Sequence, residues 1–303
     1  MARHIVVSAS PNYGVALKAL LNSWWYWHGP NGVQWHIMTY KDVPFDLPDP
    51  RMKHVEVSLP TDISAPMACK IHRFKYASHL NAYDDAVVIL DADMFFCANI
   101  DWWWPIIEGG YLLYGSNGSN IQYTPAHEEK YGIPNLAGLF NWKTVTSVPA
   151  GGMPAVFGKL WRQIYDHRTD ASKPKQGADF ELVNAYLTGW EWLDAVVTLS
   201  PAQVTNIHHY QQKPNTRVMR KGDSRLYTED GLEVCMSHGR WYSPGYVENL
   251  MKPMMRYCGE NKKCVQGAVM ARQYLLEEFE CARDYKYKER YPWRLLGWES
   301  DST

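Results

Sequence analysis

Residues 86–93 read AVVILDAD, and this stretch gives the strongest indication of the fold class. Its first five residues, 86–90, form an unbroken apolar run, which is typical of a strand buried on both faces of a parallel sheet. A similar apolar run at residues 4–9 (HIVVSA) opens the chain and leads into helical spacing over residues 15–27. Buried strands that alternate with helices in this way predict an α/β fold.

The rest of the chain continues this alternation and then becomes less regular. Because strands alternate with helices in the first part of the chain, we predict a mostly parallel sheet flanked by helices. Residues 245–287 are mainly helical and amphipathic. We therefore expect one domain over residues 1–242 and a helical C-terminal extension over residues 243–303. Further strands are expected at 35–40, 53–58, 111–115, 153–157, 192–199 and 233–237, and further helices at 67–82, 158–167 and 179–187.

The composition is that of a globular protein. Of the 303 residues, 46% are hydrophobic and 21% are charged, so the chain can bury a core and is not disordered by composition. The formal net charge of −1 gives no basic excess that would require nucleic acid or an anionic membrane as a partner. The 14 Trp and 20 Tyr suit core packing and stacking on sugars, so they are compatible with carbohydrate binding.

No segment has the pattern of a signal peptide or a membrane span, because the apolar run near the N-terminus is too short for either. We therefore expect a cytoplasmic protein without a membrane span. The six cysteines include no CxxC pair, which argues against a structural zinc cluster, and we expect reduced thiols.

Two acidic residues, Asp91 and Asp93, directly follow the strand at 86–90. In open α/β sheets, ligands bind beyond the carboxyl ends of the strands, and this spacing directs both side chains to one side of an extended chain. Neighbouring carboxylates repel each other unless a cation lies between them. Mn²⁺ or Mg²⁺ would meet that need and could bridge a diphosphate. The alternative is a strand-end turn with solvated aspartates; the apolar residues 94–96 favour the metal site.

Residues 71–76 (IHRFKY) and 84–93 (DDAVVILDAD) together resemble the core of the GT-A glycosyltransferases, especially the glycogenin-like family 8. Members of that family carry an arginine on the helix before the strand and then a viyLDaDvlv segment. The resemblance extends in patches from residue 4 to residue 241. It implies a GT-A (Rossmann-like) fold and metal-dependent transfer of a hexose from a nucleotide sugar, a UDP-sugar by default, with retention of the anomeric configuration.

The resemblance also assigns residues to the cation and the donor. Asp91 and Asp93 would bind Mn²⁺ or Mg²⁺, and Asp91 with Ala92 would contact the donor. Arg73, or Lys70 one turn earlier, would face the donor. A cation there could neutralise phosphate or orient Asp91, although an ordinary surface charge on the helix is equally compatible. The base and ribose would lie against the end of the first strand and its loop, at Ser8, Ala9, Asn12 and Tyr13.

A second segment, residues 176–184 (QGADFELVN), resembles the DQdaLN helix start of the same family. Asp179 and Glu181 would hold hydroxyls of the donor sugar or act as the acceptor base. Asp179 also has an explanation as a helix cap. Phe180 replaces the glutamine of the family, so an inverting mechanism with Asp179 or Glu181 as base stays open beside retention.

Two more positions follow from the resemblance. Gly151 and Gly152 stand where the family has an FNSG strand entry, and they would let the backbone approach the sugar closely. His238, in the segment CMSHGRW at 235–241, stands where the family has HfxGxxKPW and would be the third metal ligand. His208 and His209 are competitors for that role.

The acceptor is not determined by the sequence: a glycan, a protein hydroxyl, a lipid-linked sugar and a modified nucleobase all remain open. The C-terminal extension matches no part of the family and could form an acceptor lid or a homodimer surface. Two other functions remain alternatives. One is a sugar-phosphate nucleotidyltransferase, although residues 10–14 lack the basic side chains such an enzyme needs. The other is a sugar-binding or assembly protein on a catalytically decayed transferase scaffold.

Overall fold

The computed structural model describes residues 1–9, 13–29, 31–39, 52–56, 65–116, 120–145, 150–152, 154–174, 179–200, 203–206, 218–221, 225–228, 230–239 and 262–284. The chain divides into two compact units. Unit 1 consists of Met1–Pro11, Gly32–Asp91 and Trp102–Pro201. Unit 2 consists of Asn12–Asn31, Ala92–Asp101 and Ala202–Thr303.

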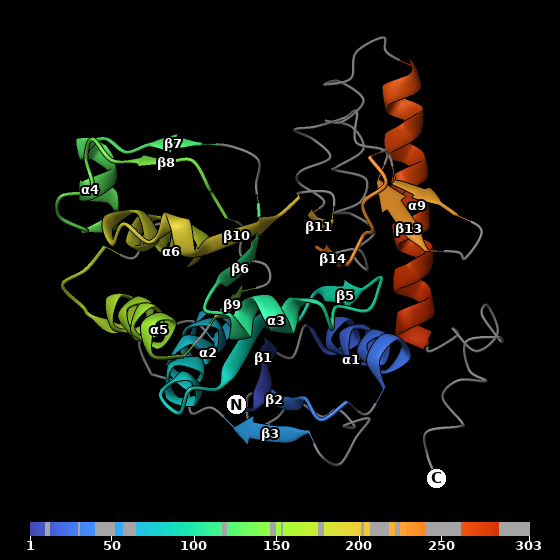
Figure 1. The fold of residues 1–303 in the computed structure, drawn as a ribbon, viewed down its shortest axis with the longest axis horizontal. Helices are drawn as coiled ribbons and strands as arrows, with labels where there is room; N and C mark the ends of the chain where they lie inside the picture. The colour runs from blue at the N-terminus through green and yellow to red at the C-terminus, as the bar shows by residue number, and fades with distance from the viewer. Residues whose placement is uncertain are drawn as a thin grey trace. The chain divides into compact units, whose positions relative to one another are not determined.

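A seven-stranded sheet with the strand order β10-β6-β9-β4-β1-β2-β3 lies at the centre of unit 1 (Figure 1). Its neighbouring strands are parallel, except that β9 runs antiparallel to both β4 and β6. The mostly parallel sheet predicted from the sequence is therefore confirmed. The strands are β1 (Arg3–Ala9), β2 (Gln34–Thr39), β3 (Lys53–Glu56), β4 (Ala86–Asp91), β6 (Leu112–Gly115), β9 (Ala150–Gly152) and β10 (Val196–Leu199).

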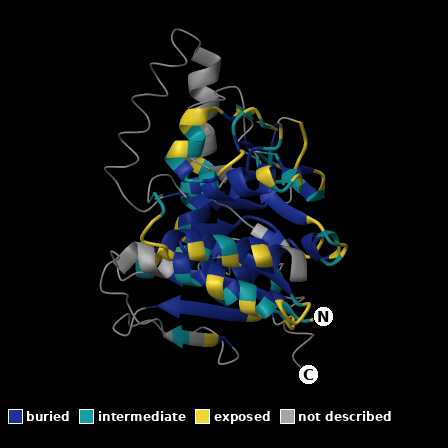
Figure 2. Cartoon of the chain, turned by 90° about the vertical axis from the view of Figure 1, so that its left-hand side faces the viewer, coloured by how far each residue is buried: buried dark blue, intermediate teal, exposed yellow. Residues whose placement is uncertain are grey.

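Helices cover both faces of this sheet. Val87 and Ile89 of β4 share a core cluster with Phe74 and Trp161, which lie on helices α2 and α5. Side chains alternate along a strand, so Val88 points to the opposite face, which α3 covers. Every residue of β4 is buried. Figure 2 shows dark blue, the colour of buried residues, along much of the sheet. The other elements of unit 1 are α2 (Ala65–Asn81), α3 (Trp103–Glu108), β7 (Ile121–Gln122), α4 (Pro125–Tyr131), β8 (Phe140–Asn141), α5 (Pro154–Thr169), α6 (Asp179–Gly189) and a 3₁₀ turn, η2 (Leu193–Ala195).

The strand predicted at 153–157 is wrong, because helix α5 already begins at Pro154. Proline is favoured in the first turn of a helix, where its missing N–H is not needed. The buried residues Phe157, Leu160, Trp161 and Ile164 then follow at helical spacing. The strand of this region lies earlier in the chain, at β9.

In the part of unit 2 that the structure describes, a small sheet is combined with helices α1 and α9. Its three-stranded sheet has the order β11-β14-β5, and β12 and β13 form a separate antiparallel pair. Phe95 of β5, Ala19 of α1, and Leu275 and Phe279 of α9 share one buried cluster. The elements are α1 (Gly14–His28), β5 (Met94–Phe96), β11 (Val204–Asn206), β12 (Val218–Arg220), β13 (Leu226–Thr228), β14 (Met236–His238) and α9 (Lys262–Asp284).

The helical character predicted for residues 245–287 is confirmed over α9, and ion pairs hold this helix within unit 2. Arg220 of β12 reaches Glu277 at 3.0 Å and Glu278 at 2.8 Å. The domain boundary expected at residue 242 lies outside the described residues. Among the helices of the described residues, none is long and apolar enough to cross a membrane.

Candidate active site

The carboxyl ends of β1 and β4 place two of the predicted site residues side by side. The two strands are parallel neighbours, and their register pairs Ser8 with Asp91. On the other side of β1, Ala9 pairs with Thr39 of β2. Ser8 and Asp91 are 7% and 3% exposed. This end of the sheet is where an open α/β fold binds its ligands.

Arg73 of α2 holds Asp91 in place. Its Nη1 donates to Asp91 Oδ1 and to the carbonyl oxygen of Leu90, the latter at 3.1 Å. Burial lowers the pKa of Arg73, but Asp91 and Asp179 raise it by more, so the pKa is raised overall and the guanidinium stays charged. Lys70, one turn earlier, is exposed. The sequence left open whether Arg73 or Lys70 faces this site; in the structure, Arg73 is the one that contacts Asp91.

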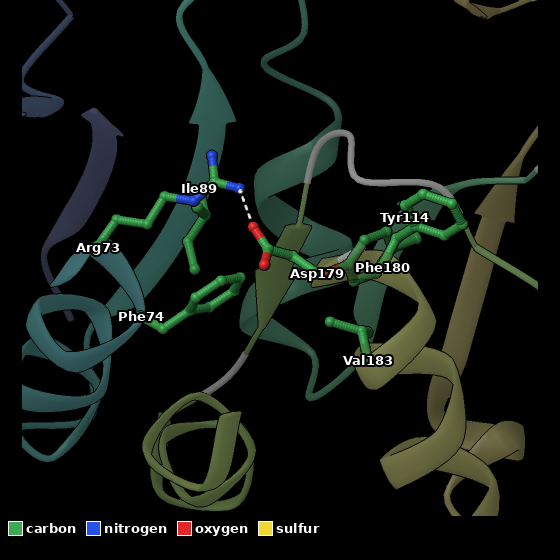
Figure 3. A pocket seen from close by; sticks show the side chains of 7 residues that line it. All are labelled: Arg73, Phe74, Ile89, Tyr114, Asp179, Phe180 and Val183. Carbon is green, nitrogen blue, oxygen red and sulfur yellow. Dashed lines mark ion pairs between the residues drawn. The ribbon is translucent and has the colours of Figure 1, made fainter. Parts of the chain in front are cut away.

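Asp179, at the start of α6, lies between two buried guanidinium groups. Its Oδ2 is 3.7 Å from Arg73 Nη2, the ion pair drawn in Figure 3, and its Oδ1 is 3.4 Å from Arg168 Nη2. Sequence reasoning missed Arg168, which lies in the last turn of α5. A cation at that position is ordinarily read as a surface charge near the carboxyl end of a helix, so no local signal marks it as buried.

A small pocket opens beside this cluster. Its seven lining side chains converge from the sheet, α2 and α6 in Figure 3, and its free space corresponds to about one water molecule. Burial raises the pKa of Tyr114; Arg73 opposes this effect, while Asp91 and Asp179 add to it. The phenol therefore stays neutral. The pocket is lined by Arg73, Phe74, Ile89, Tyr114, Asp179, Phe180 and Val183.

Glu181 lies apart from the buried cluster, although it is only two residues beyond Asp179. Its side chain is 28% exposed, and Oε1 is 3.1 Å from Lys130 Nζ of α4. Asn184, the last residue of the motif, has a packing role: its amide donates to the carbonyl oxygens of Val145 and Phe180, each at 2.9 Å. Its Oδ1 also accepts a hydrogen bond from Val145 N at 2.9 Å. Asn184 thus ties α6 to the segment before β9.

Unit 2 brings Asp93 and His238 together. Strand β14 runs antiparallel to β5 and pairs His238 with Met94, the residue after Asp93. His238 Nε2 lies 3.3 Å from Asp93 Oδ1, and the N–H of Gly239 donates to the carbonyl oxygen of Asp93 at 3.1 Å. Both side chains are partly exposed, at 14% and 13%. A residue far along the chain is therefore aligned with the acidic motif by strand pairing.

The remaining assigned residues are distributed as follows. Ala92, which links Asp91 to Asp93 along the chain, is 4% exposed. Tyr13 precedes α1 and is partly buried. Gly152 pairs with Val87 inside the sheet. Three predicted or competing positions, Asn12, His208 and His209, lie outside the described residues.

Gly151 has a packing reason to be glycine. It lies in β9, opposite Val88, and an added Cβ would overlap the Cδ1 atom of Ile107 and approach Val88 Cγ2 to 3.3 Å. We expect Gly151→Ala to lower the free energy of unfolding by about 1–3 kcal/mol, because overpacking displaces α3. Urea unfolding measures this loss.

Two further variants test the explanation. Ile107→Val removes the overlapping atom, so Gly151→Ala in that background should lose less stability than in the wild type. Gly189→Ala is the matched control, because an added Cβ meets no atom within 4 Å there. Equal losses at Gly151 and Gly189 would contradict the packing account.

Comparisons with known proteins find similarity to solved structures, of which 214 chains match, but not to known sequences. No protein-family model and no curated protein sequence matches the chain. The chain is similar to the crystal structure of the galactosyltransferase LgtC in complex with donor and acceptor sugar analogs, with 14% sequence identity and a TM-score of 0.49. The match covers 84% of this chain and 95% of that chain.

Proposed function

We propose that this protein is a metal-dependent glycosyltransferase that moves a hexose from a nucleotide-sugar donor, UDP-hexose by default, to an acceptor hydroxyl. One observation carries the proposal. Asp91 ends a buried central strand and Asp93 follows two residues later; Arg73 holds Asp91, and His238 lies 3.3 Å from Asp93. Asp91 is thereby fixed at the carboxyl end of the sheet, where open α/β folds bind their ligands, and Asp93 is its near neighbour in the chain.

The residues fit a divalent cation. Asp91, Asp93 and His238 offer carboxylate oxygens and one imidazole nitrogen. Adjacent ligands of an octahedral ion lie about 3 Å apart, since each is about 2.1 Å from the metal. The 3.3 Å between Asp93 Oδ1 and His238 Nε2 is close to that spacing. A carboxylate can serve a guanidinium with one oxygen and a cation with the other, so the bond of Asp91 to Arg73 is compatible with metal binding.

The imidazole bears on the choice of metal. Carboxylates suit Mg²⁺ and Mn²⁺ equally, whereas imidazole suits transition ions. We therefore propose Mn²⁺ rather than Mg²⁺ as the preferred ion. When bound, the ion supplies positive charge that stabilises the departing nucleotide diphosphate.

The other candidate residues are assigned to the donor or the acceptor. For Asp179 and Glu181, the exposed fraction of the side chain guides the assignment. Ser8 and Ala9, at the end of β1, and Tyr13 would line the nucleotide, with Gly151 and Gly152 nearer the sugar. Asp179 is 8% exposed and enclosed by guanidinium groups, which suits the holding of a donor hydroxyl. Glu181 is 28% exposed, so it is the better candidate for the base that meets an acceptor.

Calorimetry with UDP and a donor-hydrolysis screen test this function. We expect UDP to bind with Mn²⁺ and to lose affinity in EDTA, and one nucleotide sugar to be hydrolysed slowly without acceptor. UDP binding that ignores Mn²⁺ would contradict the proposal. Binding of a glycan without metal or nucleotide would instead indicate a sugar-binding protein, and release of pyrophosphate from a nucleoside triphosphate and a sugar phosphate would indicate a nucleotidyltransferase.

Replacement of His238 should separate Mn²⁺ from Mg²⁺. We expect His238→Ala to weaken Mn²⁺ binding by at least about tenfold, because even outer partners of a metal site have effects of that size. Mg²⁺ should lose less affinity, because it depends less on a nitrogen ligand. A Mn²⁺ titration followed by electron paramagnetic resonance measures the Mn²⁺ affinity. Competition of Mg²⁺ with bound Mn²⁺ in the same experiment measures the Mg²⁺ affinity.

The control for this substitution is His79→Ala, which removes an exposed histidine on α2. It should leave both affinities unchanged. If the two histidine variants behave alike, His238 is not a ligand.

A further inference from the structure

We propose that Arg168 is a positioning residue that keeps Arg73 on Asp91 by holding Asp179. The inference rests on the proposed function, in which Asp91 binds the cation. Arg168 is 3% exposed and lies in the last turn of α5, where the helix dipole favours a cation. Its ion pair with Asp179 connects it to Arg73 and through Arg73 to Asp91.

Among the described residues, the buried cluster contains two positive and two negative side chains. Arg73, Asp91, Arg168 and Asp179 are 2%, 3%, 3% and 8% exposed. Two guanidinium groups therefore face two carboxylates in a space that excludes most water. Charges in such surroundings are stable only when they are paired. If Arg168 is removed, Asp91 and Asp179 both still face Arg73.

The distances show how the two cations are divided. Arg73 Nη1 makes its hydrogen bonds to Asp91 and to Leu90, whereas its Nη2 lies 3.7 Å from Asp179, beyond hydrogen-bond range. Arg168 Nη2 lies nearer to Asp179, at 3.4 Å. Asp179 thus has Arg168 as its closer cation, and Arg73 is left to Asp91.

Loss of Arg168 would change this division. Of the two guanidinium ion pairs that hold Asp179, only the one to Arg73 would remain. Attraction between unit charges is strong in a poorly hydrated interior, so the guanidinium of Arg73 would be drawn from Asp91 towards Asp179. Asp91 would then lose the hydrogen bond that fixes its carboxylate, and the metal site would lose its preformed geometry.

The test is a set of Mn²⁺ dissociation constants measured by calorimetry on the full chain. We expect Arg168→Met to weaken Mn²⁺ binding by about tenfold, the effect typical of outer partners of metal ligands. Arg168→Met/Asp179→Asn should recover most of the lost affinity, because a neutral residue 179 no longer attracts Arg73. Relief of the unpaired Asp179 carboxylate could restore affinity in a purely structural case as well, so the position of Arg73 in crystal structures distinguishes the two roles. Arg162→Met is the matched control, since Arg162 is on the same helix but 55% exposed and pairs with Asp166.

Crystal structures of the wild type and of Arg168→Met supply a readout that is independent of metal. The guanidinium of Arg73 should lie on Asp91 in the wild type and on Asp179 in the variant. If Arg168→Met does not fold, Arg168→Lys replaces it in both measurements; its ammonium cannot reproduce the planar fork of arginine, so a smaller effect in the same direction is expected.

The outcomes separate the inference from the proposed function. If the wild type binds Mn²⁺ and Arg168→Met binds it equally well while losing only thermal stability, the inference is wrong and the function stands. If the wild type binds no Mn²⁺, the proposed function is wrong. In that case the crystal structures alone judge the positioning role, and Arg73 retained on Asp91 in the variant overturns it.

Discussion

Asp93→Asn should remove Mn²⁺-dependent UDP binding and lower donor turnover by about 10³-fold, because loss of a group that stabilises developing charge has effects of that order. The substitution is close to isosteric, and the Asp93 side chain is 13% exposed, so the fold should be little affected. Calorimetry of UDP with and without Mn²⁺ measures the first effect, and hydrolysis of the best donor from the screen measures the second.

Asp91→Asn should have the same functional effect and, in addition, a structural one. Asp91 is 3% exposed and accepts from Arg73. An amide cannot balance the buried guanidinium, so we expect a loss of about 3 kcal/mol in the free energy of unfolding. Asp91→Asn should therefore lose both Mn²⁺-dependent UDP binding and stability, whereas Asp93→Asn should lose only the binding. This difference would show that Asp91, unlike Asp93, is also part of the buried cluster.

The control for both is Asp84→Asn. Asp84 is exposed in the turn before β4 and has a φ of 60°, a conformation that asparagine adopts readily. It should keep UDP binding and stability unchanged. If Asp93→Asn bound UDP and Mn²⁺ as Asp84→Asn does, the cation site would not be where we propose it.

Arg73→Met should lower the free energy of unfolding by about 3–5 kcal/mol, the usual result of removing one partner from a buried ion pair. Arg73 is 2% exposed and faces both Asp91 and Asp179, so its loss leaves more negative than positive charge in the core. Urea unfolding followed by circular dichroism measures the change. Arg162→Met, on an exposed ion pair, should cost no more than about 0.5 kcal/mol.

A double variant tests whether unpaired charge causes the loss of stability in Arg73→Met. Arg73→Met combined with Asp91→Asn removes one charge of each sign, so the double variant should be more stable than the sum of the two single losses implies. Strict additivity would show that the loss comes from packing of the long arginine side chain rather than from charge.

Much of the fold could be predicted from the sequence because its signals are local. The apolar run at 86–90 and the helical spacing before it identify β4 and α2, and both are confirmed. The prediction failed at 153–157, where a short apolar segment suits a strand or a buried helix equally well. Pro154 was the local sign of a helix start, and the packing of Phe157 and Trp161 against α2 resolves the ambiguity.

The candidate site was predictable to the extent that its residues are neighbours in sequence. Asp91 and Asp93 are two residues apart, so the chain itself keeps them close, but the extended backbone that we predicted through them is wrong: β4 ends at Asp91 and residues 92–93 form a turn before β5. The pairing of His238 with this segment depends on the strand β14 meeting β5, a contact between distant parts of the chain. Only the resemblance to known transferases pointed to it beforehand, and its role as a metal ligand stays a prediction.

The α/β class, the buried strand and the acidic pair that follows it can be predicted from local patterns, because apolar periodicity and chain adjacency act over a few residues. The choice of Arg73 as the cation that holds Asp91, the ion pair between Arg168 and Asp179, and the room that Gly151 leaves for Ile107 became known only from the folded chain. These facts depend on which surfaces of α2, α3, α5 and α6 meet the sheet. Burial and charge pairing arise from those contacts between distant segments, so no local pattern encodes them.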